Sequence, residues 1–218
     1  PPEDPRDVVE QSARAERADV ILDKYIQAIG GAARAAALTS FVATGTSTGY
    51  GPDSDKRPIE IAAKAPNQRA VIVRSASGTS TTEFDGRSAW IAAPFRPVPV
   101  LALAGADLDG VRLDAELAFP SRIKQALGNW RTGNPIAIDG REVQVVQGIG
   151  AGGVLATLYF DSETGLLRRQ VRYVDSPVGR IPTQVDYEDY RDVAGVKMPF
   201  RWTVTWLDGR DTVELSEV

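Results

Sequence analysis

The chain contains neither cysteine nor histidine among its 218 residues. Without cysteine it can form no disulfide, no thiolate metal site and no covalently attached haem. Without histidine it lacks the usual general base and the commonest metal ligand. Few routes to an active site remain, so we expect a protein that is not an enzyme and that carries no metal and no cofactor.

Long apolar runs and an excess of positive charge are also missing. No apolar run approaches the roughly 18 residues of a membrane-spanning helix, so we expect no transmembrane span. The net charge is −4, whereas a nucleic-acid partner would require a basic patch. The 43% hydrophobic content suits a globular domain, and a single β-rich domain of this length is ordinary. We therefore expect no nucleic-acid partner and a single globular domain.

The first part of the chain predicts a linker and then helices. Residues 1–17 begin with a Pro-rich, acidic segment, which is typical of a linker leading into the first helix. Apolar residues recur near the helical period across 7–29, most clearly late in that range, and Gly30-Gly31 is expected to end the helix. A short Ala-rich helix is expected at 32–38. Residues 18–218 are then expected to form one domain, in which these helices cover a sheet.

Short runs rich in β-branched and aromatic residues make up most of the remaining chain. About five predicted strands precede a helical insertion at 107–117 and 122–127, and about six follow it. Asp85-Gly86 predicts a hairpin turn, and 154–218 predicts an antiparallel meander. Within 200–206, bulky apolar side chains alternate with polar ones, as in a strand with one buried face. Because strands and helices do not alternate, a parallel sheet is disfavoured and a mainly β (α+β) fold is expected.

Large apolar side chains are spread over the predicted strands and the helical insertion. They could form an ordinary core or line an incompletely filled pocket between a curved sheet and its helical covers. Two features favour the pocket: the Pro- and Ala-rich segment 92–105 is typical of a lid, and the first half of the sheet carries many small residues. The candidate ligand-binding residues are Phe84, Trp90, Phe95, Leu101, Leu103, Phe119, Ile123, Leu127, Trp202 and Trp206.

Polar clusters give weaker signals. Ser121 and Lys124 have the Ser-x-x-Lys spacing of some hydrolases, but the companion motifs are missing, which favours a helix-capping serine and a surface lysine. The carboxylates within 186–192 match no calcium-binding loop and are typical of a solvated strand face. The Arg-rich run 168–172 either faces solvent or receives an anionic head group. An enzyme is the least favoured of the functional hypotheses.

Four stretches resemble LolA-like periplasmic lipoprotein carriers and lipoprotein-sorting proteins: 18–31, 82–90, 159–167 and 186–200. The resemblance implies an unclosed antiparallel β-barrel (half-barrel) with an N-terminal helix, a helical lid insertion and an apolar cavity for acyl chains. The best-known carriers of this family use an arginine of the barrel to hold the lid, and Arg69 is the candidate here.

The resemblance also implies where the protein works and with what. We expect a periplasmic or outer-membrane-associated protein of the cell envelope that binds a lipid or lipoprotein acyl chain. The alternative is a structural or interaction domain of a larger envelope or electron-transfer assembly. That alternative arises because the chain also resembles a domain attached behind a multihaem cytochrome c of the reaction-centre type. Its partners would then be envelope proteins or a cytochrome module.

Overall fold

One antiparallel sheet runs through the part of the chain that the computed structural model describes, residues 8–49, 54–176, 179–207 and 209–218. Its strands are β1 (Ser40–Gly49), β2 (Lys56–Lys64), β3 (Gln68–Ser75), β4 (Gly78–Phe84), β5 (Ala89–Ala92), β6 (Val100–Leu103), β7 (Leu127–Ile138), β8 (Arg141–Gly150), β9 (Leu155–Asp161), β10 (Leu167–Ser176), β11 (Gly179–Val193), β12 (Val196–Trp206) and β13 (Gly209–Glu217). The helices are α1 (Ala18–Ala28), α2 (Ala32–Ala37), α3 (Gly105–Leu117) and α4 (Ile123–Ala126), with short 3-10 turns η2 (Pro120–Arg122) and η3 (Ala151–Gly153).

The sheet is open, with β6 at one edge and β7 at the other. Between these edges the order is β5, β4, β3, β2, β1, β13, β12, β11, β10, β9 and β8, so the two halves of the chain meet where β1 pairs with β13. Thr46 is opposite Glu214 and Thr48 is opposite Thr212 at this junction. The expected unclosed antiparallel barrel with few helices is therefore confirmed.

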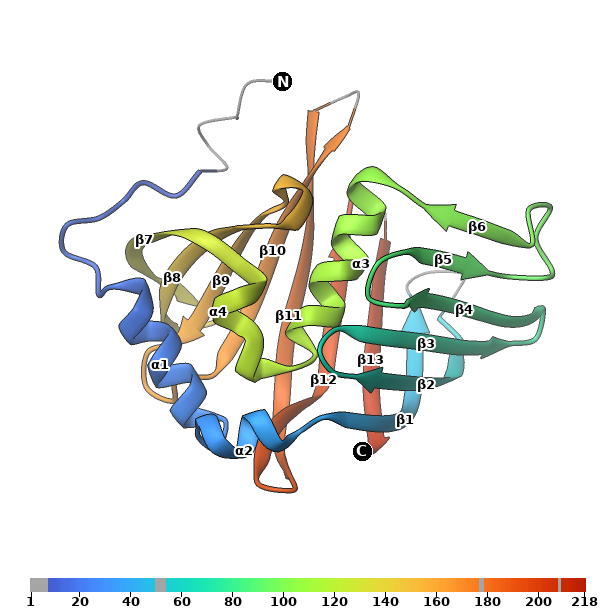
Figure 1. Cartoon of the computed structure of the whole chain (residues 1–218), viewed down its shortest axis with the longest axis horizontal. Helices are drawn as coiled ribbons and strands as arrows, with labels where there is room; N and C mark the ends of the chain where they lie inside the picture. Colours follow the sequence, from blue (N-terminus) through green and yellow to red (C-terminus); the bar gives the residue numbers. More distant parts are fainter. Residues whose placement is uncertain (1–7, 50–53, 177–178, 208) are drawn as a thin grey trace.

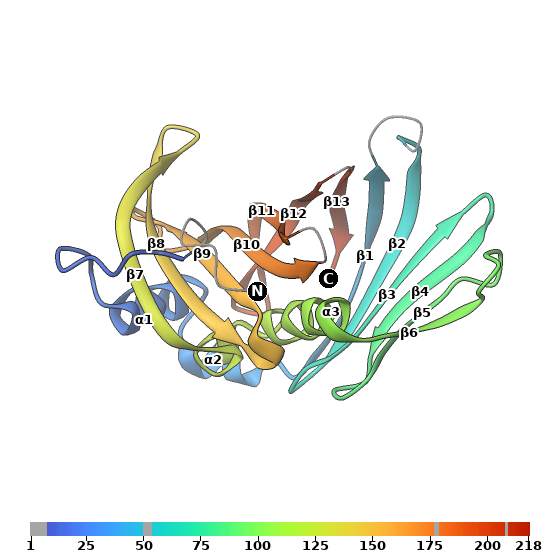
Figure 2. The same cartoon turned by 90° about the horizontal axis from the view of Figure 1, so that it is seen from above.

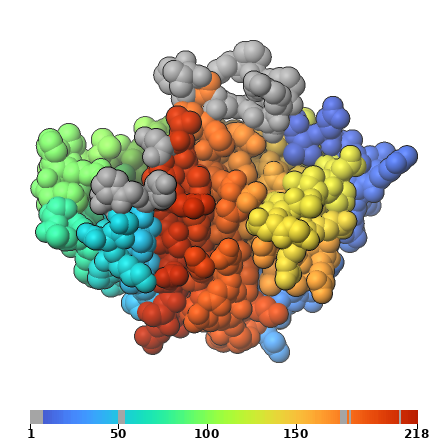
Figure 3. Space-filling view, turned by 180° about the vertical axis from the view of Figure 1, so that it is seen from behind, coloured from blue at the N-terminus to red at the C-terminus, as the bar shows by residue number. Residues whose placement is uncertain are grey.

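Helices lie on the concave side of this curved sheet (Figure 1). Seen from above, the two arms of the sheet diverge, and α3 lies in the space between them (Figure 2). The view from behind shows the opposite, convex face, where the red and orange strands β11, β12 and β13 occupy the centre (Figure 3). α3 therefore covers part of the concave face of the sheet.

Alternation along the strands decides which side chains reach the concave face. On β2, Ile59, Ile61 and Ala63 are buried, while the intervening residues are partly exposed. On the other arm, α1 buries an apolar stripe against β8 and β9, and the ring of Tyr25 lies 5.3 Å from that of Phe160. Within the described ranges, every helix is too short or too polar to cross a membrane. The core therefore has three regions: one under α1, one within β1, β2, β12 and β13, and a smaller one where α3 packs on β4 and β5.

The first helix is shorter than the periodicity predicts. It begins at Ala18, and residues 9–12 instead run along the edge of the sheet. The backbone N–H of Val9 donates to the side chain of Gln147 at 2.9 Å, and the N–H of Ser12 donates to the carbonyl of Thr132 at 2.8 Å. These hydrogen bonds satisfy backbone groups that a helix would otherwise pair internally. Of the predicted linker 1–17, residues 1–7 lie outside the described residues.

The segment that covers the concave face also differs from the one expected. Segment 92–105 was expected to form a lid, but its β6 portion pairs with β5 as an edge strand, with Ile91 opposite Leu101. Proline excludes a central strand position but is compatible with a loop next to an edge strand. The predicted helix 107–117 does form, as α3, and it is this helix that lies over the concave face (Figure 2).

The predicted helix stop at Gly30-Gly31 is confirmed, and it lies against the turn between β11 and β12. Gly30 has a φ of +123°, and a Cβ there would lie 2.1 Å from the carbonyl oxygen of Gly195. The carbonyl of Ile29 accepts a hydrogen bond of 2.8 Å from the N–H of Lys197. The turn therefore cannot move away from Gly30 without breaking a contact between α1 and β12.

Replacing Gly30 with Ala should consequently lower the free energy of unfolding by about 3 kcal/mol or more, because backbone strain and a steric clash add. Chemical denaturation measures this loss. Gly140→Ala is the matched control: its φ is +76°, but a Cβ there meets no atom within 4 Å, so we expect a loss of about 1 kcal/mol. Equal losses in the two variants would contradict the role assigned to the contact with Gly195.

Candidate functional site

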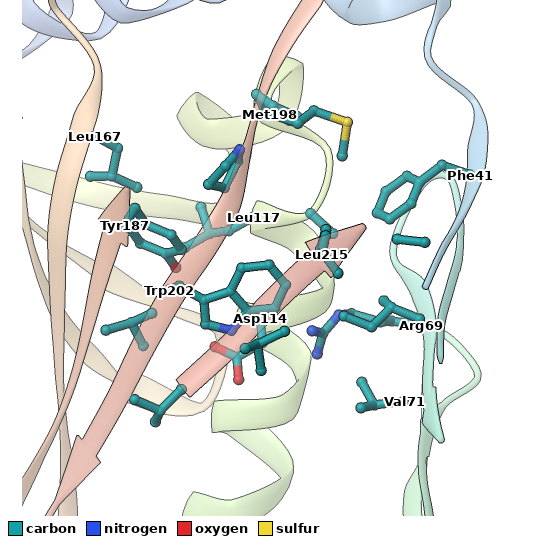
Figure 4. A pocket seen from close by; sticks show the side chains of 18 of the residues that line it. Phe41, Arg69, Val71, Asp114, Leu117, Leu167, Tyr187, Met198, Trp202 and Leu215 are labelled. Atoms are coloured by element: carbon teal, nitrogen blue, oxygen red, sulfur yellow. The ribbon is translucent and has the colours of Figure 1, made fainter. Parts of the chain in front are cut away.

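A cavity of about 340 Å³ lies between the concave face of the sheet and α3. Strands β1, β2, β3, β12 and β13 supply most of its wall, which is mainly apolar. Figure 4 shows Phe41, Leu117, Met198, Trp202 and Leu215 around this space. The wall therefore comes from segments far apart in the sequence, brought together by the pairing of β1 with β13.

Period-two alternation aims the wall residues inward. On β3, Val71 and Val73 line the cavity, whereas Ile72 lies between them and points to the other face. On β12, Trp202 and Val204 line it in the same way. Val71, Val73, Trp202 and Val204 are each only partly buried, and all four border the cavity.

One ion pair links the sheet to α3. Arg172 of β10 donates from Nη1 to Oδ1 of Asp114 at 2.7 Å, and both side chains are largely buried. The helix passes close to Arg172 at Gly110, where an added Cβ would lie only 3.0 Å from the Nε of the arginine. A second pair, Arg112 with Asp109 at 3.1 Å, lies within the helix itself. Arg172 thus ties α3 to β10, in addition to the apolar packing of α3 against β4 and β5.

Arg69 lies on the opposite wall and has no such partner. Its guanidinium points from β3 into the space shared with Asp114 and Trp202 (Figure 4). Among the described residues it makes no side-chain hydrogen bond and no ion pair within 4.0 Å. Burial lowers the pKa of Arg69, and the charge of Asp114 offsets part of that effect. The family resemblance suggested Arg69 as the lid-holding arginine, but in this structure the ion pair to α3 belongs to Arg172.

Two further polar side chains border the same region. The hydroxyl of Tyr187 donates to Oε1 of Gln170 at 3.2 Å, and burial raises the pKa of Tyr187, with a further contribution from Asp114. The Nε2 of Gln170 is buried and finds no hydrogen-bond partner in the part of the chain that the structure describes. The site is therefore an apolar cavity with a small polar group at one part of its wall.

The ten residues proposed from the sequence fall into three groups. Ile123 and Trp202 line the cavity. Five others are buried or half-buried within the protein outside the cavity wall or at its margin, namely Phe84, Trp90, Leu103, Phe119 and Leu127. Three are exposed, namely Phe95 at 43%, Leu101 at 52% and Trp206 at 41%. The structure therefore brings two of the ten together at this cavity, and a ligand-binding role for the others stays a prediction.

Several wall residues were not proposed from the sequence. Ile59, Ile61, Val71 and Val73 occupy alternate positions of predicted strands, so their shared face is visible in the sequence. What the sequence did not show is that this face meets β12 and β13 across a gap. The alternating apolar residues of the strands on both sides of the β1–β13 junction were the sequence feature that could have predicted the site.

The polar clusters weighed from the sequence are mostly paired. Asp186 accepts from Arg169 at 2.5 Å, and Asp189 accepts from Arg191 at 2.5 Å. Lys124 is 2.6 Å from Asp23, on the surface. Across the described ranges, no three acidic side chains gather closely enough to hold a metal ion. These contacts are typical of ion pairs on strand and helix surfaces.

No protein-family model and no curated protein sequence matches the chain. Solved structures do. A LolA superfamily protein from Nitrosomonas europaea is 18% identical, with 93% of each chain covered and a TM-score of 0.62. A putative outer membrane lipoprotein-sorting protein domain from Vibrio parahaemolyticus is 11% identical over 92% of each chain, with a TM-score of 0.61. A DUF1329 family protein from Desulfovibrio piger is 10% identical, covering 91% of this chain and 90% of its own, with a TM-score of 0.62. The chain therefore has the fold of LolA superfamily and lipoprotein-sorting domains.

Proposed function

We propose that this protein is a non-enzymatic binding module of the cell envelope that holds the acyl chain of a lipid or lipoprotein in the cavity beneath α3. The observation that carries the proposal is the partly open, mainly apolar cavity of about 340 Å³ between the sheet and α3. Pockets for small ligands span roughly 300–1,000 Å³, so this one lies at the lower end. Its size favours one acyl chain over several.

The energetics of such binding are sufficient. Each buried methylene contributes about 0.8 kcal/mol, so a chain with roughly ten buried methylenes gains about 8 kcal/mol before the loss of translational and rotational freedom is subtracted. A neutral chain needs no polar partner from the wall, and the wall offers mainly apolar side chains. The affinity would therefore come from burial of the tail.

The comparisons support an envelope location. The Vibrio parahaemolyticus structure carries the name of an outer membrane lipoprotein-sorting domain, and the Nitrosomonas europaea structure that of the LolA superfamily. A protein with this fold would meet lipids and lipoproteins in the periplasm or at the outer membrane. That setting supplies the ligand class that the cavity fits.

The proposal is tested by titrating delipidated protein with a fluorescent fatty acid. We expect saturable binding of one probe per chain, with quenching of Trp202, whose indole lines the cavity. A Trp202→Phe variant should retain binding and lose most of the quenching. Probe fluorescence that rises without saturation, as for nonspecific adsorption, would contradict the proposal.

One observation favours the interaction-domain alternative. Phe95, Val98, Val100 and Leu101 are all exposed, at or beside the edge strand β6. Exposed apolar side chains grouped at a sheet edge are typical of a protein contact. If the domain serves a larger assembly, the full-length gene product should copurify with its partner module, and haem absorbance would identify a cytochrome. In that case the double variant Val100→Lys with Leu101→Lys should abolish the association and leave acyl binding unchanged.

A further inference from the structure

The charges around the cavity do not balance. Among the described residues, the guanidinium groups of Arg69 and Arg172 both interact with the carboxylate of Asp114. Arg172 holds this carboxylate at 2.7 Å. Arg69 is left with its charge directed into a mainly apolar space, and it has no hydrogen-bond acceptor among the described residues.

The other charged residues near the cavity do not compensate Arg69. The hydroxyl of Ser47 donates to the carboxylate of Asp211, with both oxygens within 2.9 Å, and Asp211 lies 3.6 Å from Arg57, so its charge is already paired. Lys197, also at the cavity wall, adds positive charge, and its side chain is exposed. The cavity therefore presents a net positive centre at Arg69.

We propose that the ligand is a single-chain amphiphile with an anionic oxygen head, a fatty-acid carboxylate, and that Arg69 is its counter-ion. This inference rests on the proposed function and narrows its ligand class. The tail would lie among Phe41, Val71, Leu117 and Leu215, which surround the guanidinium in Figure 4. The planar guanidinium can donate two parallel hydrogen bonds to one carboxylate, an arrangement that combines charge and geometry.

An anion explains a feature that a neutral ligand leaves unexplained. Taking a cation out of water is unfavourable unless it gains a partner, and the lowered pKa of Arg69 reflects this burial. A purely apolar ligand would displace water from the guanidinium and make the imbalance worse. A carboxylate head would neutralise the group and replace the lost water contacts, so tail burial and head pairing would act together.

The experiment compares palmitate with its methyl ester at about pH 8, where the acid is ionised. Both have the same tail, so the ratio of their dissociation constants isolates the head group. We expect wild-type protein to bind palmitate at least about tenfold more tightly than the ester. Arg69→Met, which keeps the length of the side chain and removes its charge, should bind both equally, at the wild-type affinity for the ester or better.

Arg74→Met is the matched control, because Arg74 lies five residues along the same strand, is exposed and pairs with Glu60 at 3.3 Å. It should keep the wild-type preference. A third titration with hexadecyl phosphate distinguishes a carboxylate head from a phosphate head, and preference for either anion over the ester supports Arg69 as counter-ion.

The outcomes separate this inference from the proposed function. If wild-type protein binds palmitate and ester equally, the inference fails and acyl binding stands. If neither binds, the proposed function fails and the inference with it. Loss of the preference in Arg74→Met as well as in Arg69→Met would also overturn the assignment, since surface charge would then explain it. The wild-type comparison decides the question even if Arg69→Met does not fold.

Discussion

Replacing Val71 with Trp should abolish acyl-chain binding, with the dissociation constant rising at least about a hundredfold. Val71 lies on β3 with its side chain in the cavity, next to the space that Arg69 enters. An indole at this position would occupy the volume that we assign to the tail. Ile72→Trp places the same side chain one residue along, on the other face of the strand, and should leave the dissociation constant within about twofold.

Titration with the fluorescent fatty acid measures both variants, and thermal unfolding shows whether each is folded. Overfilling a packed site destabilises a protein by about 1–3 kcal/mol, so a modest fall in stability is acceptable for Val71→Trp. Val73→Phe, two residues along on the cavity face, provides a second test and should weaken binding in the same direction. Undiminished binding in folded Val71→Trp would place the ligand elsewhere on the protein.

Removing Asp114 should destabilise the protein more than removing its partner Arg172. Arg172→Met leaves Asp114 free to pair with Arg69, whereas Asp114→Asn leaves two interacting guanidinium groups without the carboxylate between them. Breaking a buried ion pair costs about 3–5 kcal/mol, and side-chain exposures of 16% and 30% reduce that figure here. We expect losses of about 2 kcal/mol for Asp114→Asn and about 1 kcal/mol or less for Arg172→Met.

Chemical denaturation of the two variants gives the comparison directly. Hydrogen exchange of the α3 amides gives a local readout, because the ion pair ties this helix to β10. Exchange should accelerate more in Asp114→Asn than in Arg172→Met. Removal of Arg69 from the Asp114→Asn variant should recover part of the loss, since the repulsion between the two cations would be gone. A larger loss for Arg172→Met would show that Arg69 does not interact with Asp114.

The fold could largely be anticipated from local signals. The Asp85-Gly86 turn joins β4 and β5 as expected, with the N–H of Asp85 donating to the carbonyl of Ser88 at 3.1 Å. The alternation on 200–206 and the glycines at 30–31 also correspond to what the structure shows. These features depend on residues close together in the sequence. The half-barrel itself was implied by the family resemblance, because the pairing of the first strand with the last has no local signature.

The site was harder to anticipate, and the reason is physical. The sequence predicted large side chains such as Phe84 and Phe119 as ligand contacts. Large side chains also fill space, and these two are almost fully buried in the protein interior. Open space remains where smaller residues such as Ala43 and Val71, two strands apart on one arm, line the cavity. Which strand faces meet across a gap depends on the curvature of the whole sheet, which no single segment encodes.

The ion pairs between charged residues were equally difficult to predict from the sequence. The sequence offered the Arg-rich run 168–172 as a solvent face or an anion site, and it gave Arg69 only through the family resemblance. In the structure Arg169 pairs with Asp186 and Arg172 pairs with Asp114, so neither guanidinium is free. Sequence separation between Arg172 and Asp114 is 58 residues, and their contact depends on α3 folding back over β10. Only the assembled site shows which arginine lacks a partner.

Photolabelling with a fatty acid that carries a diazirine in its tail tests the central claim most directly, because it reports where an acyl chain lies in the unmodified protein. Mass spectrometry of the digested adduct should place the label on cavity residues such as Val71, Leu117 and Trp202, and unlabelled palmitate should compete for it. Labelling confined to the exposed group around Val100 and Leu101, with the cavity residues unlabelled, would contradict a ligand site beneath α3.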